Sequence, residues 1–471
     1  MRILIGNHID PAIRDRGDLR AWTQRIVWFA RDGDLIVLSN EPDARFLAYA
    51  TSLTGVDPAI LRILIPATGA YDARLLDPES LTSAEFVDTV LAALGDTGAD
   101  QVEEVFALWP SAHVSRFAAA LGIEDRFAGA GFFAQGGGEL GNNKATFRAV
   151  AAGAGVPIPV GAVCRSEREA VAATAALLDT TGAVMVKQAH NGAGVGNQLL
   201  LRDASLASDH VGARHLHQLD GHGREAIEGY WRERWEWASA QGRFPVVVEE
   251  FSPHTASVYS EHLAADDGTR PTEMGTLLYV GRRLSHQVVP LRGVHDSVRV
   301  QLRHGGARLA ETYRALGYRG YLSADAIVTT DGRVLFTEVN AQVSGSLHIY
   351  QVIAHQIVDT AAAPQRSVVE YHVPPTWAVP DFDTFLAAVD GLGCAYDPAT
   401  RTGVIVSMPV IPQQVNRAQF VFCIAYATDT DRQAVFNRLD ARFAAVPTDA
   451  FSASDHIGVP SAPASAVRGI R

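Results

Sequence analysis

Residues 321–340, YLSADAIVTTDGRVLFTEVN, contain two segments of alternating polarity on either side of an Asp-Gly pair. This alternation is typical of strands, and Asp331-Gly332 is typical of a tight hairpin turn. A two-residue turn would place Asp325 directly opposite Glu338, with Asn340 two residues further along the same face. The predicted apolar face consists of Leu322, Ala324, Ala326, Val328, Leu335, Thr337 and Val339.

The facing carboxylates of this hairpin indicate a cation site. Two acidic side chains directly opposite each other have Cβ atoms about 4.5–5.5 Å apart and repel. Oxygen ligands suit Mg²⁺, which commonly bridges carboxylates and nucleotide phosphates. We therefore expect Asp325, Glu338 and Asn340 to hold Mg²⁺. The alternative is a solvated face with its charges in open water, and a longer turn would shift the register.

The composition is that of an ordinary globular protein. The chain has 471 residues, 47% hydrophobic and 20% charged, which is enough for roughly two to four domains. A net charge of −12 argues against a nucleic-acid partner, which needs a basic surface. No apolar run is long enough to span a membrane, and MRILIGNHID does not resemble a signal peptide. The three cysteines are far apart, so we expect no disulfides and a cytoplasmic location.

The first 135 residues predict an α/β domain, and a helix with a lysine at its start follows them. Apolar runs near residues 3–5, 35–38 and 60–65 are typical of buried strands, and residues 80–95 and 113–122 have helical spacing. After glycines 136–138, Asn142 or Asn143 can cap a helix that begins at Lys144. Lys144 would otherwise be an ordinary surface lysine.

A strand, a lysine and a glycine-rich loop follow at residues 183–196, AVMVKQAHNGAGVG. Glycines in such a loop allow backbone N–H groups to approach phosphates, with Lys187 as a point charge. Because a strand follows the loop, neither a Rossmann nor a Walker A motif fits. A plain flexible hairpin is an equally good interpretation. The predicted phosphate-binding residues here are Lys187, Gln188, Gly192 and Gly194.

The strand FPVVVEEF, residues 244–251, ends in two glutamates before a proline. Unpaired backbone groups at such a strand end can recognise an adenine, although two solvated acids are an equally good interpretation. Upstream, a zinc site formed by His210, His215, His217 and His222 is conceivable but lacks supporting cysteines. The aromatic stripe in residues 225–240 predicts packing rather than a stacking platform. Four prolines in residues 364–380 predict a linker.

Four segments stand in one order: Asn143-Lys144, the VMVK–glycine loop, VVVEEF, and Asp325 with Glu338-x-Asn340. Together they resemble the ATP-grasp superfamily over about residues 132–360. More narrowly, MRILIGNHID, NNKATFR and EVNAQVSGSLH resemble the pheganomycin-type peptide ligases. The resemblance implies an α/β protein with an N-terminal pre-ATP-grasp domain (1–140), an ATP-grasp domain (141–365) and a small C-terminal α/β domain (366–471). The ATP-grasp domain would include a glycine-flap lid at about residues 157–250.

The resemblance also implies roles for particular residues. ATP would be bound by Lys144, Lys187, Gln188, Gly192, Gly194, Glu249, Glu250 and Phe251, and Mg²⁺ by Asp325, Glu338 and Asn340. Ser323 and Gln342 stand where relatives keep a catalytic arginine. We therefore expect Arg292, or Arg319 behind it, to stabilise the transition state. Thr255 or Ser257 occupies the neighbourhood expected to hold the ribose.

The activity implied is ATP-dependent ligation of a carboxylate to an amine through an acyl phosphate. The narrower resemblance implies that a nonproteinogenic amino acid is joined to a peptide in antibiotic biosynthesis. Other ATP-grasp chemistry, a kinase or a carboxylase, remains an alternative, although no biotin-carrier lysine motif is visible. A silent nucleotide-binding regulatory protein is the other alternative. The expected partners are an amino acid and a peptide amine, and a homodimer is compatible with the sequence.

Overall fold

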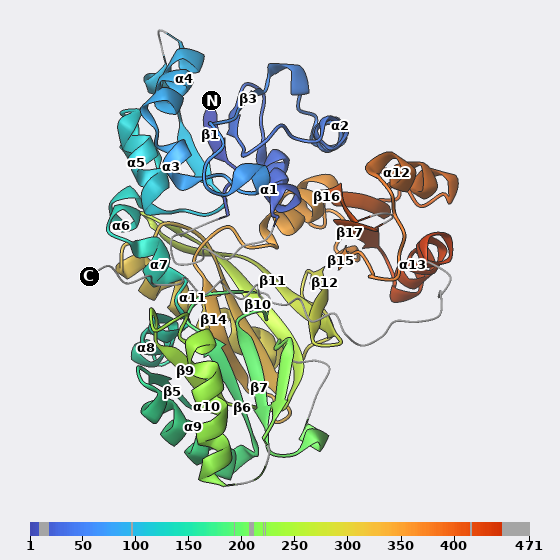
Figure 1. The fold of residues 1–471 in the computed structure, drawn as a ribbon. Helices are drawn as coiled ribbons and strands as arrows, with labels where there is room; N and C mark the ends of the chain where they lie inside the picture. The colour runs from blue at the N-terminus through green and yellow to red at the C-terminus, as the bar shows by residue number, and fades with distance from the viewer. Residues whose placement is uncertain are drawn as a thin grey trace, which may run out of the picture.

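A computed structural model describes residues 1–8, 18–95, 98–192, 194–206, 212–219, 221, 223–414 and 417–444. Within these residues the strands form sheets of four, five and eight strands. The four-stranded sheet and its helices occupy the upper part of Figure 1, and the five-stranded sheet occupies the lower part. The eight-stranded sheet runs between them towards the C-terminal helices on the right (Figure 1).

The N-terminal part is an α/β unit with a parallel sheet in the order β3-β2-β1-β4. All four residues of β1 are buried, as expected for a parallel strand covered on both faces. The sheet confirms the predicted strands near residues 3, 35 and 60. Its strands are β1 (Arg2–Ile5), β2 (Leu35–Val37), β3 (Arg62–Leu64) and β4 (Glu104–Ala107). Its helices include α1 (Arg20–Gln24), the 3₁₀ helix η1 (Arg25–Phe29), α2 (Ala44–Thr54), α3 (Pro78–Leu81), α4 (Ala84–Leu94) and α5 (Ala112–Ala120).

The five-stranded sheet has the order β5-β9-β6-β7-β8 and carries the glycine-rich loop between β6 and β7. Helices α9 and α10 pack on it, and Trp231 of α10 is fully buried, which confirms that the aromatic stripe serves packing. The strands are β5 (Gly161–Cys164), β6 (Ala183–Gln188), β7 (Asn197–Leu201), β8 (His215–Gln218) and β9 (Val246–Glu250). The helices are α9 (Glu167–Thr181) and α10 (Arg224–Ala238).

The eight-stranded sheet has the order β14-β13-β10-β11-β12-β15-β17-β16. Helix α11 (Asp296–Ala315) packs on one face through Val298, Leu302 and Leu309, and the opposite face carries Asp325. The strands are β10 (His254–Ala265), β11 (Gly268–Val280), β12 (Arg283–Val289), β13 (Gly320–Thr329), β14 (Val334–Asn340), β15 (Ser367–His372), β16 (Gly403–Gln414) and β17 (Arg417–Tyr426). The remaining long helices are α8 (Lys144–Gly153), the π-helix η7 (Ile349–Ile357), α12 (Phe382–Gly391) and α13 (Asp429–Phe443).

The predicted linker at residues 364–380 is wrong, because these residues contain the interior strand β15. Its first five residues are buried, and it pairs with β12 on one side and β17 on the other. The prolines flank the short apolar run SVVEYH and do not interrupt it, so they cost no hydrogen bond of the sheet. The sheet is therefore continuous across residue 366, and the proposed domain boundaries stay predictions.

The hairpin confirms the pairing of Asp325 with Glu338 but not the turn from which it was derived. Three residues, 330–332, connect the hydrogen-bonded pair Thr329 and Arg333. This longer turn shifts the register by one residue, and a β-bulge at Thr337 shifts it back before Glu338. The bulge also corrects the apolar face: Val334 and Phe336 pack into the core in place of the predicted Leu335 and Thr337.

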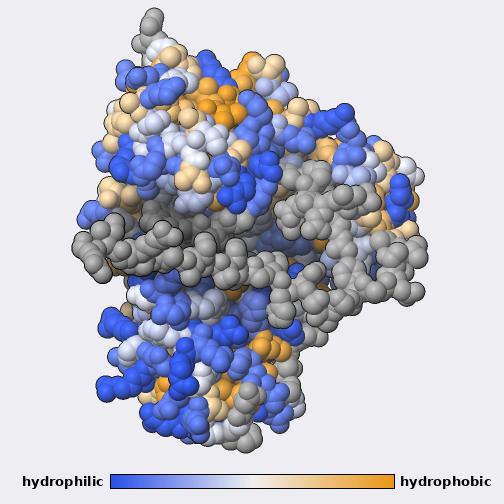
Figure 2. All heavy atoms as spheres, viewed as in Figure 1, coloured by the Kyte–Doolittle hydropathy of each residue, from blue (hydrophilic) through white to orange (hydrophobic). Residues whose placement is uncertain are grey.

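Several predictions about the whole chain can be compared with the described residues. No helix there is long and apolar enough to cross a membrane. The three cysteines are buried free thiols, as predicted. No group of three or more metal-binding His, Cys, Asp or Glu side chains occurs among the described residues; His210 and His222 lie outside them. The visible face in Figure 2 is largely hydrophilic, with apolar residues in small separate groups.

Candidate active site

A cavity of about 480 Å³ lies where the N-terminal unit, the five-stranded sheet and the eight-stranded sheet meet. Asp325, Glu338 and Asn340 line it, and so do Lys144 and Lys187. These residues come from β13, β14, α8 and β6, so the fold brings together segments almost 200 residues apart. The predicted metal ligands and phosphate-binding lysines therefore share one cavity.

The pKa values of the two carboxylates at the centre of this cavity, Asp325 and Glu338, are shifted in opposite directions. Burial and the neighbouring Glu338 raise the pKa of Asp325 well above its usual value. Burial also opposes ionisation of Glu338, but Lys144 and Lys187 outweigh it and lower the pKa of Glu338. Asp325 accepts hydrogen bonds from Ser323 Oγ at 3.1 Å and from Asn340 Nδ2 at 3.3 Å. A divalent cation between these oxygens would favour the ionised form of Asp325, so this oxygen-rich donor set fits Mg²⁺.

Lys144 enters the cavity from the first turn of α8. Asn143 caps this helix by accepting hydrogen bonds from the backbone N–H groups of Ala145 and Thr146, at 2.9 and 3.2 Å. The Lys144 ammonium lies 2.9 Å from Glu338 Oε2 and donates to the carbonyl of Asn191 at 2.6 Å. Its side chain is buried, so it is not the surface lysine of the alternative interpretation.

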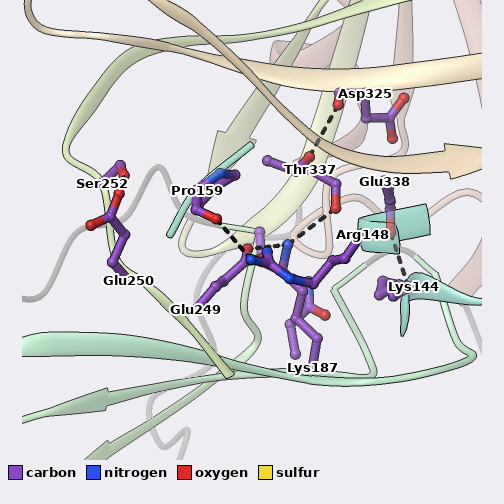
Figure 3. Close-up of polar contacts among 12 residues, drawn as sticks. Lys144, Arg148, Pro159, Lys187, Glu249, Glu250, Ser252, Asp325, Thr337 and Glu338 are labelled. Carbon is purple, nitrogen blue, oxygen red and sulfur yellow. Dashed lines mark hydrogen bonds and ion pairs between the residues drawn. The ribbon is translucent and has the colours of Figure 1, made fainter. Parts of the chain in front are cut away.

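Lys187 and Arg148 converge on Glu249, as Figure 3 shows. Lys187 forms an ion pair with Glu249 and donates to the carbonyl of Thr337 at 3.3 Å. The bulge leaves Thr337 without a ladder partner of its own, and its carbonyl accepts from Lys187. Arg148 pairs with Glu249 at 2.9 Å and donates to the carbonyl of Pro159 at 3.0 Å. The sequence analysis missed Arg148, although it follows Lys144 by four residues and so shares its helix face.

The glycine-rich loop joins two antiparallel strands, as predicted, and Gly192 and Gly194 line the cavity. Gln188, which was predicted to bind ATP, does not line it. Its side-chain amide donates to the carbonyl of Trp237 at 2.6 Å and accepts from Asn191 at 2.7 Å, so it supports the loop from behind.

The end of β9 lines the same cavity through Glu249, Glu250 and Phe251. The backbone N–H groups predicted to be unpaired here are not: Glu250 donates to the carbonyl of Val160 at 2.8 Å and Phe251 to that of Ala183 at 3.1 Å. Any ligand contact of this segment must therefore use its carbonyl groups or side chains.

Neither predicted catalytic arginine reaches the cavity. Arg292 is exposed and donates to Ser367 Oγ at 3.2 Å and to the carbonyl of Arg366 at 3.2 Å. Arg319 pairs with Asp266 at 2.6 Å beside a different surface pocket. Backbone carbonyls and a serine hydroxyl hold the guanidinium of Arg292, and Asp266 holds that of Arg319. Their predicted place in the active site is corrected accordingly. Two arginines that the sequence analysis missed, Arg25 and Arg214, line the cavity instead.

Comparison with known proteins agrees with this architecture. Residues 23–123 match the family model of the pre-ATP-grasp domain. The chain as a whole has the α/β ATP-grasp fold with an N-terminal pre-ATP-grasp domain, as predicted. No curated protein matches the sequence.

Three enzymes of solved structure illustrate the similarity in fold. An N5-carboxyaminoimidazole ribonucleotide synthetase bound to ADP has a TM-score of 0.55 at 12% identity, over 93% of this chain and 94% of that one. Biotin carboxylase from Campylobacter jejuni has a TM-score of 0.56 at 12% identity, over 93% and 91%. An L-amino acid ligase from Bacillus licheniformis has a TM-score of 0.53 at 13% identity, over 94% and 97%. At these identities the likeness concerns the fold.

Proposed function

We propose that the protein is an ATP-dependent carboxylate–amine ligase that forms an amide bond through an acyl phosphate. The observation that carries the proposal is the shared cavity: two facing carboxylates, two buried lysines and a glycine-rich loop, with further space beyond them. Phosphoryl transfer requires groups that position the phosphates and stabilise their charge, and the residues of this cavity are of the types that do so. The L-amino acid ligase among the fold relatives favours amide formation.

In this proposal Asp325, Glu338 and Asn340 hold Mg²⁺, which when bound would neutralise charge on the nucleotide phosphates. Lys144 exchanges Glu338, and Lys187 exchanges the carbonyl of Thr337, for phosphate oxygens. Glu249, fixed by Arg148, keeps Lys187 at the end of β6 and directed towards the phosphates. The loop containing Gly192 and Gly194 approaches the phosphates through backbone N–H groups, which side chains there would obstruct.

The chemistry would proceed in two steps. A substrate carboxylate attacks the γ-phosphorus of ATP, forms an acyl phosphate and releases ADP. An amine then attacks the acyl carbon, loses a proton and expels inorganic phosphate, which leaves an amide. Exclusion of water during the reaction would protect the acyl phosphate from hydrolysis.

The narrower part of the proposal is that one substrate is a nonproteinogenic amino acid and the other a peptide. Its support is the resemblance of EVNAQVSGSLH and NNKATFR to the pheganomycin-type peptide ligases. The segment AQVSGSL, which follows the Glu338-x-Asn340 motif, lines the cavity with Gln342, Ser344, Gly345 and Ser346 and so is placed to contact a substrate.

The experiment is an assay of ADP release with purified protein, MgATP, mixed amino acids and short peptides, read together with a mass scan of the products. A ligase releases ADP only when a carboxylate and an amine are both present, and the product mass equals their sum less one water. ADP release that depends on bicarbonate would favour a carboxylase, like the fold relative biotin carboxylase. ATP binding without ADP release under all these conditions would favour a silent nucleotide-binding protein.

A further inference from the structure

Arg25 is the least solvent-exposed arginine of the cavity. It is 0% exposed, stands at the start of η1 and reaches the cavity from the N-terminal unit. Its guanidinium donates to the carbonyls of Val343, at 3.1 Å, and Ser344. The guanidinium carbon lies 4.6 Å from the centre of the Trp22 ring, which covers one side of it. The planar guanidinium of Arg25 is therefore fixed in orientation. The two carbonyls that hold it follow the Glu338-x-Asn340 motif by only a few residues.

The positive charge of Arg25 has no adequate counter-charge in the described part of the chain. Among the described residues, the acceptors of its guanidinium are the neutral carbonyls of Val343 and Ser344, and its Nε has no hydrogen-bond partner. Burial lowers the pKa of the Arg25 guanidinium to about 9, although Glu370 and Glu261 act in the opposite direction. A buried cation held mainly by neutral carbonyls is costly unless an anion completes its environment.

The walls around Arg25 are polar and held in place. Gln287 donates to Glu370 Oε2 at 2.6 Å and accepts from Ser346 Oγ at 2.8 Å, so its side-chain amide is fixed. Gln342, on the same segment as Ser346, has a buried side-chain oxygen without a partner. Gly345 permits the close approach of Trp22, because a Cβ atom there would lie 3.1 Å from the indole ring. We call the cavity walls formed by Trp22, Arg25, Gln287, Gln342, Ser346 and Glu370 the Arg25 lobe.

We propose that the Arg25 lobe binds a substrate that carries a carboxylate, and that the Arg25 guanidinium is the group that binds this carboxylate. The inference rests on the proposed function and deepens it, since a carboxylate–amine ligase must hold at least one carboxylate beside the nucleotide. A planar guanidinium matches a carboxylate better than an ammonium group does. The carboxylate could belong to the acyl donor or to the far end of the amine substrate, and the kinetics below distinguish these sources.

The test measures binding of small probes to the full-length protein saturated with MgADP, through intrinsic tryptophan fluorescence. The probes are acetate, glycine and methylammonium, titrated separately at constant ionic strength. Trp22 should report binding because it touches Arg25. Arg25→Lys keeps the charge and removes the fork, and Trp22→Phe removes the reporter. The matched control is Arg20→Met, which changes a half-exposed arginine on the neighbouring helix that pairs with Asp18 outside the cavity.

Acetate and glycine should each give a saturable change in wild-type fluorescence that methylammonium does not give. The acetate dissociation constant should rise at least about tenfold in Arg25→Lys, the usual loss for a charge-assisted hydrogen bond, and stay unchanged in Arg20→Met. If Arg25→Lys fails to bind MgADP, the test uses only the acetate titrations of wild type and Trp22→Phe. A saturable signal that vanishes in Trp22→Phe supports the site, and no saturable acetate signal in wild type overturns it.

Turnover separates this inference from the proposed function. With a substrate pair found in the ADP-release assay, Arg25→Lys should raise the KM of one substrate while the KM of MgATP stays constant. The substrate affected is the one whose carboxylate occupies the lobe. Ligation with all KM values unchanged in Arg25→Lys would overturn the inference and leave the proposed ligase activity intact.

Discussion

Replacing Glu261 by glutamine should stabilise the protein at neutral and alkaline pH. Glu261 lies on β10 with 0% exposure, and Ser344 Oγ donates to its Oε1 at 2.5 Å. Its other oxygen, Oε2, has no hydrogen-bond partner. Burial raises the pKa of Glu261 from 4.5 to about 8. The folded protein therefore holds a proton that the unfolded chain releases once the pH exceeds about 4.5.

The sign and size of the effect follow from this pKa. Between pH 4.5 and 8 the folded state binds more protons than the unfolded state, so the stability contributed by Glu261 is complete below pH 4.5 and falls as the pH rises to 8. Each pH unit costs about 1.4 kcal/mol, so wild type loses about 4 kcal/mol by pH 7.5. Glutamine keeps an acceptor for Ser344 and cannot ionise, so the variant should lack this loss.

The assay is thermal unfolding of wild type and Glu261→Gln at pH 5 and pH 8. About 4 kcal/mol corresponds to roughly 4 °C in Tm for a chain of 471 residues that unfolds as one unit. The two proteins should differ little at pH 5, and the variant should have the higher Tm at pH 8. Glu233→Gln, an exposed change on α10, controls for the loss of one acid. A Tm difference that is the same at both pH values would refute the buried, protonated state of Glu261.

Three further substitutions test the active site. Glu338→Ala should lower ADP formation by at least about 10²-fold. Its Tm should stay near wild type, because Lys144 keeps its hydrogen bond to the carbonyl of Asn191. Near-normal turnover would contradict the proposed metal site. Lys187→Ala should weaken MgATP binding roughly 10- to 100-fold in equilibrium titrations, because charged hydrogen bonds to phosphate are lost. The control is Arg202→Ala, which removes a cation paired with Asp179 outside the cavity. An equal loss of affinity in Arg202→Ala would mean that only bulk charge matters. Arg292→Ala should keep wild-type kcat because Arg292 lies outside the cavity, and a large fall in kcat with intact ATP binding would restore its catalytic role.

The pairing of Asp325 with Glu338 was predictable from the sequence, but through two errors that cancel. The Asp-Gly signal correctly indicated a hairpin, yet the turn is one residue longer than assumed. The bulge at Thr337 then restores the register at Asp325 and Glu338. Threonine is an ordinary strand residue, so nothing local marks Thr337 as the extra one. The carbonyl of Thr337 accepts a hydrogen bond from Lys187, 150 residues earlier in the chain, and no local pattern reveals that contact.

Contacts distant in sequence also explain what the sequence analysis missed. Arg25 follows three residues after Trp22 in a short helical stretch, where an arginine is ordinarily a solvated residue. Its burial depends on the carbonyls of Val343 and Ser344, more than 300 residues away. Helix α8 and the glycine-rich loop, in contrast, were predicted because Asn143, Gly192 and Gly194 act through local backbone geometry.

The position of β15 inside the eight-stranded sheet has a consequence for synthesis on the ribosome. Strand β12 ends at Val289, and its neighbour β15 begins only at Ser367, so about 80 residues must be added before that side of β12 can be covered. At roughly 5–20 residues per second, the nascent chain presents an unpaired strand edge for about 4–16 seconds. Such an edge is a template for pairing with another chain. Truncation between residues 290 and 366 would make that exposure permanent, so fragments ending there should aggregate or require a chaperone during expression.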